Sequence, residues 1–141
     1  MDKIARLSAH DRAELIRTAA IQNGTILPAL IEKDFWVCWT LKRVFALENP
    51  PAGLIFKGGT SLSKVYQAID RFSEDVDLSF DRNTLGYGGD NDPSKAPSRN
   101  KTEQKLEELS DACRQMIQKT FLPRLEKAFT SALGSPPAMG N

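Results

Sequence analysis

Several features that would assign this 141-residue chain to a class are scarce or absent. The formal net charge is only +1, so the chain as a whole does not attract nucleic acid or membranes, and a polyanion would need a local patch. The apolar runs are far shorter than a membrane span, and the N-terminus, MDKIARLSAHD, is charged where a signal peptide needs an apolar core. These absences favour a soluble cytoplasmic protein.

Cysteine is also scarce. Cys38 and Cys113 lie far apart within apolar helical patterns and form no C-x-x-C pair. Two buried free thiols are a simpler interpretation than a disulfide or a pair of metal ligands, and they suit a reducing compartment. With 40% hydrophobic and 26% charged residues, the composition is that of one globular domain over residues 1–141.

Helical patterns occupy the N-terminal region, residues 8–47. Ser8, followed three residues later by an aspartate, resembles a capping box and predicts a helix to about Gln22. Pro28 suits the first turn of a second helix to about Leu47, whose apolar residues cover several sides and predict burial.

The C-terminal part combines a loop with a long helix. Residues 81–100 are rich in turn formers and contain little that can pack, so we expect a mobile, flexible loop. Helical spacing returns over residues 101–133. Pro123 must kink or split this helix, because proline lacks the amide donor.

The centre of the chain changes its pattern twice within FKGGTSLSKVYQAIDRFSEDVDLSF, residues 56–80. The apolar run 54–56 between two glycines predicts a buried strand, and the spacing from 62 to 69 predicts a helix. From 75 to 80 apolar and polar residues alternate, which predicts a strand with one apolar face. The order helix, helix, strand, helix, strand predicts an α+β fold with its motif core at 54–80.

A glycine pair stands where the first strand should end and the next helix begin. Gly58 and Gly59 allow a sharp turn and the close approach of a ligand to the backbone. Thr60 or Ser61 can cap the helix, whose unpaired first amides stabilise an anion such as a triphosphate. This is not a Walker A loop, because Lys64 is followed by valine. Taken alone, the stretch is better explained by a tight turn and an ordinary cap.

Two aspartates downstream of the turn favour the ligand-binding interpretation over the ordinary turn. On a strand, Asp75 and Asp77 point to the same side, about 6–7 Å apart along the chain, where like charges repel unless a cation lies between them. Carboxylate oxygens suit Mg²⁺ or Mn²⁺. The alternative is a solvated strand face on which Asp75 or Glu74 pairs with Arg71. With the glycine turn upstream, the pair predicts metal-assisted nucleotidyl transfer.

At these residues the sequence resembles the nucleotidyltransferase AbiEii/AbiGii toxin family, within the DNA polymerase beta-like nucleotidyltransferase superfamily. The match is close over residues 56–80 and extends to IEKDFWVCWTLKRVF at 31–45. The superfamily pattern is a Gly-Gly or Gly-Ser turn, a helix, and Asp-x-Asp or Asp-x-Glu on the next strand. The resemblance covers roughly residues 25–80 and implies a nucleotidyltransferase-like core of the polymerase beta type.

The resemblance also implies roles for individual residues. Asp75 and Asp77 would be the catalytic magnesium ligands, and the turn residues would hold the phosphates of the nucleotide. Positively charged and hydroxyl side chains around the turn would support the nucleotide or the turn itself. The implied nucleotide-binding residues are Lys57, Gly58, Gly59, Thr60, Ser61, Lys64, Arg71 and Ser73.

Family members are toxins of bacterial toxin–antitoxin and phage-defence systems. The resemblance implies Mg²⁺- or Mn²⁺-dependent transfer from a nucleoside triphosphate to RNA, such as the 3′ end of transfer RNA, and a cognate antitoxin as partner. Transfer to a protein hydroxyl is a second possible acceptor chemistry. A glycosyltransferase, in which Asp-x-Asp also holds a metal, fits less well, because the motif follows the glycine turn by one helix.

The sequence departs from the family in length. Members are usually much longer and carry a third carboxylate and a basic residue on further strands. The nearby acids Asp81, Asp90 and Asp92 are not on a predicted strand facing Asp75. We therefore expect a fragment, a truncated gene product or a minimal form that needs another subunit. The alternative is a catalytically incomplete relative that binds nucleotide or a partner. The Glu-Lys-Asp triplet at 32–34 is either an exposed, salt-bridged edge or part of the site's surroundings.

Overall fold

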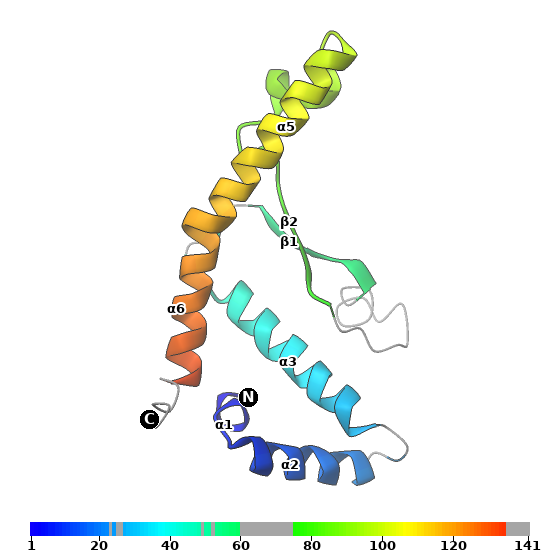
Figure 1. Ribbon diagram of the computed structural model, residues 1–141, viewed down its shortest axis with the longest axis vertical. Coiled ribbons are helices and arrows are strands. Elements are labelled where there is room, and N and C mark those ends of the chain that lie inside the picture. Colours follow the sequence, from blue (N-terminus) through cyan, green and yellow to red (C-terminus); the bar gives the residue numbers. More distant parts are fainter. Residues whose placement is uncertain (23, 25–26, 49, 52, 60–74, 135–141) are drawn as a thin grey trace, which may run out of the picture.

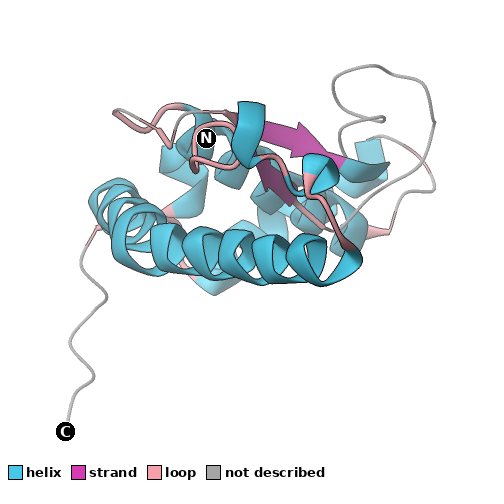
Figure 2. Cartoon of the chain, turned by 90° about the horizontal axis from the view of Figure 1, so that it is seen from above, coloured by secondary structure: helices cyan, strands magenta, loops and turns pink. Residues whose placement is uncertain are grey.

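The chain folds into helices around a small antiparallel sheet, which confirms the predicted α+β class (Figure 1). The computed structural model describes residues 1–22, 24, 27–48, 50–51, 53–59 and 75–134. The elements are α1 (Asp2–Ala5), α2 (Ala9–Gln22), α3 (Pro28–Phe45), β1 (Leu54–Lys57), β2 (Asp77–Phe80), α5 (Arg99–Met116) and α6 (Leu122–Leu133). Short 3₁₀ helices occupy Gly89–Asn91 and Pro93–Lys95. Figure 2 shows the two strands flanked by helices.

Ser8 caps the helix as predicted, although the Asp11 side chain bonds to the Ser8 hydroxyl and not to its backbone amide as in a full capping box. The Ser8 hydroxyl oxygen accepts a hydrogen bond from the Asp11 amide at 3.1 Å, and the hydroxyl donates to the Asp11 carboxylate at 2.8 Å. These bonds satisfy an amide of the first turn that has no partner inside the helix, so α2 begins at Ala9. The second predicted helix is also present, with Pro28 in its first turn.

Helix α3 provides the centre of the core. Trp39 and Val44 are fully buried, and the Trp39 ring packs edge to face against Phe129 of α6, with centroids 5.0 Å apart. The Trp39 indole donates to the Asp2 carboxylate at 3.1 Å, and Arg43 forms an ion pair with the same carboxylate. These contacts hold α1, a helix that the sequence pattern did not predict, against α3.

The long C-terminal helix is split, as Pro123 predicted. A π-helical turn at Ile117–Phe121 separates α5 from α6, and Pro123 lies in the first turn of α6. Proline has no amide hydrogen and its ring crowds the carbonyl four residues earlier, so a wider turn at this point removes the conflict. Phe121 is buried at the end of the π turn, and its ring lies 5.4 Å from that of Phe80.

The sheet corrects two expectations. The strand predicted to be buried, β1, is only half-buried on one side and exposed on the other, where Ile55 is 48% exposed. β2 begins at Asp77, so Asp75 precedes the strand instead of lying within it. The helix predicted over 62–69 lies outside the described residues.

The segment after β2 packs more than expected. It contains two 3₁₀ helices, and Asp92 is only 9% exposed, with its carboxylate 2.7 Å from the Arg82 guanidinium. The prediction that little in 81–100 can pack is therefore wrong, although its mobility stays a prediction. Hydrogen bonds from the backbone amide and hydroxyl of Ser94, reinforced by Arg82, lower the pKa of Asp92 below its ordinary value of 3.8.

Candidate functional site

The glycine turn and the second aspartate of the motif lie at the same end of the sheet. β1 and β2 run antiparallel, and the register pairs Lys57, the last residue of β1, with Asp77, the first residue of β2. Gly58 and Gly59 follow Lys57 directly. The fold therefore brings together residues that are 18 or more positions apart in the sequence, as the motif predicted.

The register also divides the sheet into two different faces. Residues directly opposite in an antiparallel ladder project from the same side. The polar face consists of Ile55, Lys57, Asp77 and Ser79, and the apolar face consists of Leu54, Phe56, Leu78 and Phe80. On the polar face, Lys57 and Asp77 are exposed. The apolar face contacts helices, with Phe56 6.5 Å from Phe45 of α3 and Phe80 against Phe121.

Gly58 and Asp77 fit against each other closely. Gly58 has φ of +76°, a conformation that residues with a side chain rarely adopt. A Cβ added to Gly58 would lie 1.9 Å from Oδ2 and 2.9 Å from Cγ of Asp77. The Asp77 carboxylate therefore occupies the space that a side chain at Gly58 would need, directly against the turn.

Asp75 lies just before β2, on the solvent side. Exposure alternates along the approach to the strand, because Asp75 and Asp77 are exposed whereas Val76 and Leu78 are half-buried. This alternation is the one expected if the two carboxylates share a side of the chain. The assignment of both as catalytic metal ligands stays a prediction.

The donor chemistry fits a hard divalent cation. Asp75 and Asp77 are exposed, and carboxylate oxygens are ligands that Mg²⁺ and Mn²⁺ prefer. Within the described ranges, no cluster of three or more His, Cys, Asp or Glu side chains could hold a metal ion.

The predicted nucleotide-binding residues divide into two groups. Lys57, Gly58 and Gly59 are described, and they lie at the sheet end beside Asp77. The remaining members of the predicted set lie outside the described residues: Thr60, Ser61, Lys64, Arg71 and Ser73. Glu74, which the alternative interpretation places in a surface ion pair, also lies outside them.

The Glu-Lys-Asp triplet is on α3, where Glu32 faces α2. The Glu32 carboxylate lies 3.7 Å from Nε of Arg12. This contact agrees with the interpretation of the triplet as a salt-bridged helix edge.

The two cysteines are free thiols, as predicted. Cys38 and Cys113 are, however, half-buried, whereas the sequence predicted full burial.

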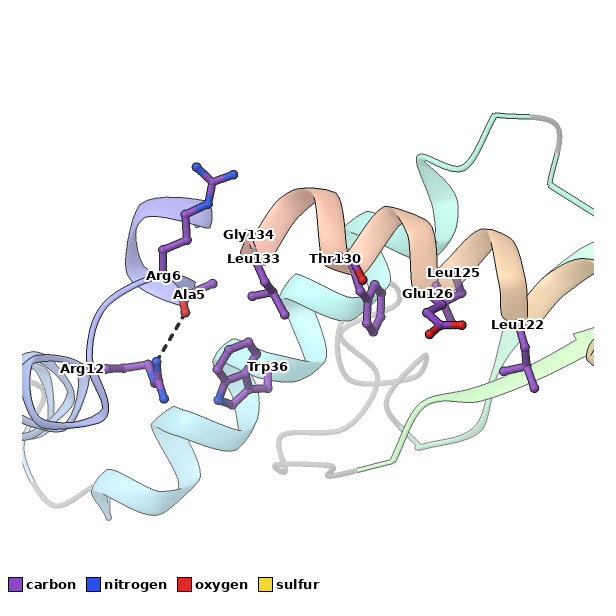
Figure 3. A pocket seen from close by; sticks show the side chains of 11 residues that line it. Ala5, Arg6, Arg12, Trp36, Leu122, Leu125, Glu126, Thr130, Leu133 and Gly134 are labelled. Atoms are coloured by element: carbon purple, nitrogen blue, oxygen red, sulfur yellow. Dashed lines mark hydrogen bonds between the residues drawn. The ribbon is translucent and has the colours of Figure 1, made fainter. Parts of the chain in front are cut away.

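An apolar groove of about 790 Å³ lies elsewhere, between the N-terminal helices and α6 (Figure 3). Trp36 and the α6 side chains Leu125, Phe129 and Leu133 line it. At its edge the Arg12 guanidinium lies 5.2 Å from the Trp36 ring and donates to the Ala5 carbonyl at 3.4 Å. No lining residue belongs to β1, β2 or the glycine turn. Sequence reasoning missed this groove, because its walls come from distant segments.

These features define an α+β chain with a glycine turn packed against an acidic strand end. Comparison with protein families gives the class: the model described as "Nucleotidyl transferase AbiEii toxin, Type IV TA system" matches residues 39–137. The chain belongs to this family of nucleotidyl transferases from toxin–antitoxin systems. The match includes the Gly-Gly turn, both aspartates, α5 and α6, whereas the Glu-Lys-Asp triplet lies outside it.

Two further comparisons gave no relatives. No curated protein matches the chain, and no solved structure matches it. None of the helices in the described ranges is long and apolar enough to cross a membrane.

Proposed function

We propose that this protein transfers a nucleotide from a nucleoside triphosphate to an RNA acceptor, such as the 3′ end of transfer RNA, with Mg²⁺ or Mn²⁺ held by Asp75 and Asp77. Membership of the nucleotidyl transferase family supports the reaction class. The metal, the acceptor and the role of each residue belong to the proposal.

One observation supports this proposal more than any other: the Asp77 carboxylate lies directly against the Gly58 backbone at one end of the sheet. A ligand bound there would meet both an acidic group and a turn without side chains. Lys57, opposite Asp77 in the ladder, adds a positive charge on the same face. A metal–nucleotide complex, in which phosphate and cation lie side by side, suits this combination of charges.

Different residues of the chain would bind the cation and the phosphates. Asp75 and Asp77 would hold the cation, while Gly58 and Gly59 would admit the phosphates close to the backbone. Lys57 would pair with phosphate oxygens. A bound metal ion would supply charge stabilisation to the transferring phosphoryl group. The proposed partners are therefore a nucleoside triphosphate, RNA and a cognate antitoxin of the same system.

The test is transfer by the purified chain. Wild-type protein is incubated with Mg²⁺, transfer RNA and each α-labelled nucleoside triphosphate in turn, with EDTA as the metal-free control. Asp75→Ala is the test variant. Asp90→Ala, which removes another exposed carboxylate from the 3₁₀ segment, is the matched control. We expect wild type and Asp90→Ala to label RNA and Asp75→Ala to label almost none.

Equal labelling by wild type and Asp75→Ala would rule out the proposed role of the acidic pair. The same reactions with total cell lysate separate acceptors, because label in protein instead of RNA would indicate transfer to a protein hydroxyl. Calorimetric binding of nucleotide without transfer in any reaction would support the catalytically incomplete relative and overturn the proposed activity.

A further inference from the structure

Strand β1 is bracketed by two glycines that adopt the same unusual conformation. Gly53 precedes the strand with φ of +74°, and Gly58 follows it with φ of +76°. Each glycine lies against an aspartate at the corresponding end of the partner strand, Asp81 for Gly53 and Asp77 for Gly58. The two ends of the ladder can therefore be compared directly.

At the Gly53 end, the contact closes the backbone ladder. A Cβ on Gly53 would lie 2.3 Å from Cβ and 3.1 Å from the amide nitrogen of Asp81. That amide donates to the Gly53 carbonyl at 2.9 Å. These atoms belong to the main chain or to its first side-chain atom, so no rotation of the Asp81 side chain could relieve the conflict.

At the Gly58 end, the contact involves the carboxylate itself. The nearest atoms to a Cβ on Gly58 would be Oδ2 and Cγ of Asp77, whereas Asp77 Cβ would be 3.1 Å away. A side chain at Gly58 would push the carboxylate into another rotamer and leave the ladder almost intact. Because Asp77 is exposed, such a rotation has space to occur.

We propose that Gly58 is a positioning residue, whose missing side chain leaves the space that sets the orientation of the Asp77 carboxylate in the metal site. This inference rests on the proposed function for its consequence, because orientation matters only if Asp77 binds a cation. Its geometric part concerns the free protein and can be tested alone. The assignment also differs from the implied role of Gly58 as a residue that only holds phosphates.

The test compares Gly58→Ala with Gly53→Ala, a control that imposes the same φ strain at the other end of β1. Urea denaturation measures stability, and electron paramagnetic resonance measures binding of free Mn²⁺ to the full chain. We expect Gly53→Ala to lower the urea midpoint more, because its conflict cannot rotate away, and to keep Mn²⁺ affinity within about twofold of wild type. We expect Gly58→Ala to lose about 10- to 100-fold in affinity, the loss typical of groups that orient metal ligands.

A second pair of variants asks whether Gly58 acts through Asp77. Asp77→Ala and the double variant Gly58→Ala/Asp77→Ala should bind Mn²⁺ equally weakly, since the orientation of a missing carboxylate has no effect. A further loss in the double variant would overturn the inference. Unchanged Mn²⁺ affinity in folded Gly58→Ala would also overturn it. So would a loss of Mn²⁺ affinity that is proportional to the loss of stability in both Gly58→Ala and Gly53→Ala.

A separate measurement distinguishes failure of this inference from failure of the proposed function. Nuclear Overhauser spectra of the metal-free wild type should show a strong contact between the Gly58 α protons and the Asp77 β protons. Presence of this contact without any Mn²⁺ binding would retain the geometry and overturn the metal site. Absence of the contact would overturn the positioning role, whatever the protein binds.

Discussion

The two faces of the β1–β2 sheet contrast sharply, although each comes from alternate residues of the same two short strands. The apolar face packs its phenylalanines against α3 and the π turn, while the polar face presents Lys57 and Asp77 to solvent. One face joins the sheet to the helices, and the other carries residues that we propose to bind metal and nucleotide. Strand alternation thus separates the residues that stabilise the fold from those proposed to bind a ligand.

This contrast predicts that variants on the two faces fail in different ways. Changes on the polar face should reduce metal binding or transfer and leave the free energy of unfolding almost unchanged. Changes on the apolar face should reduce the free energy of unfolding, and activity only through the folded fraction.

Asp77→Asn should reduce transfer on the order of a thousandfold, because a lost metal ligand removes several kcal/mol of transition-state stabilisation, here about 4 kcal/mol. The amide keeps the size of the side chain and stays exposed, so unfolding in urea should change by less than about 0.5 kcal/mol. Initial rates and urea titrations on the same preparation check both values. A large loss of stability would contradict the separation of the faces.

Phe121→Ala should destabilise the fold by about 3 kcal/mol, the lower end for removal of a buried phenylalanine. Phe121 is 6% exposed and supports the apolar face through Phe80. Urea denaturation followed by tryptophan fluorescence measures the change. Without urea, where the variant is folded, its metal affinity should equal that of wild type. A loss of metal affinity in the folded variant would show that the two faces are coupled.

Ile55→Thr and Phe56→Ala compare neighbouring residues on opposite faces. Ile55 is 48% exposed, so its substitution by threonine should cost less than about 0.5 kcal/mol. Phe56 is half-buried beside Phe45, and its truncation should cost about 2 kcal/mol, less than a fully buried phenylalanine. Thermal or urea unfolding of both variants gives the ratio, and equal costs would contradict the register.

The smallest effect is expected outside both faces, at Asp92. Its folded-state pKa lies below its ordinary value, so the ionised carboxylate stabilises the fold above about pH 3.8. This stability is lost as the pH falls through the unfolded value toward the folded one. Asp92→Asn should therefore be less stable than wild type near neutral pH, and the difference should shrink on acidification. Urea midpoints between pH 6 and pH 2.5 check it; a constant difference would contradict the assignment.

Local signals in the sequence predicted local structure well. Ser8 capped its helix, Pro28 began the next, and Pro123 split the last, because each depends on bonds within a few residues. The alternation after Asp75 also gave the two-faced strand, although β2 begins two residues later. Structure that depends on contacts within one segment could therefore be predicted from the sequence.

Contacts between distant segments were not. α1 depends on bonds from Asp2 to Trp39 and Arg43, and its own four residues contain too little periodicity to predict it. Asp92 is buried and pairs with Arg82, within a segment whose composition suggested a loop. In the site, the motif predicted that glycine and aspartate meet, but the fit of the Asp77 carboxylate against Gly58 required the ladder register.

The π turn at Ile117–Phe121 takes up one extra residue within the long C-terminal helix. An extra residue in a regular α-helix would rotate everything after it by about 100° about the helix axis, whereas the wider π turn accommodates that residue and keeps the direction of the side chains that follow. Upstream of the turn, Leu109 and Cys113 face the space beside β2; downstream, Phe129 faces Trp39. Deleting a single residue within the turn would let it close as an ordinary α turn, and both helices would keep the sides that they present to β2 and to Trp39.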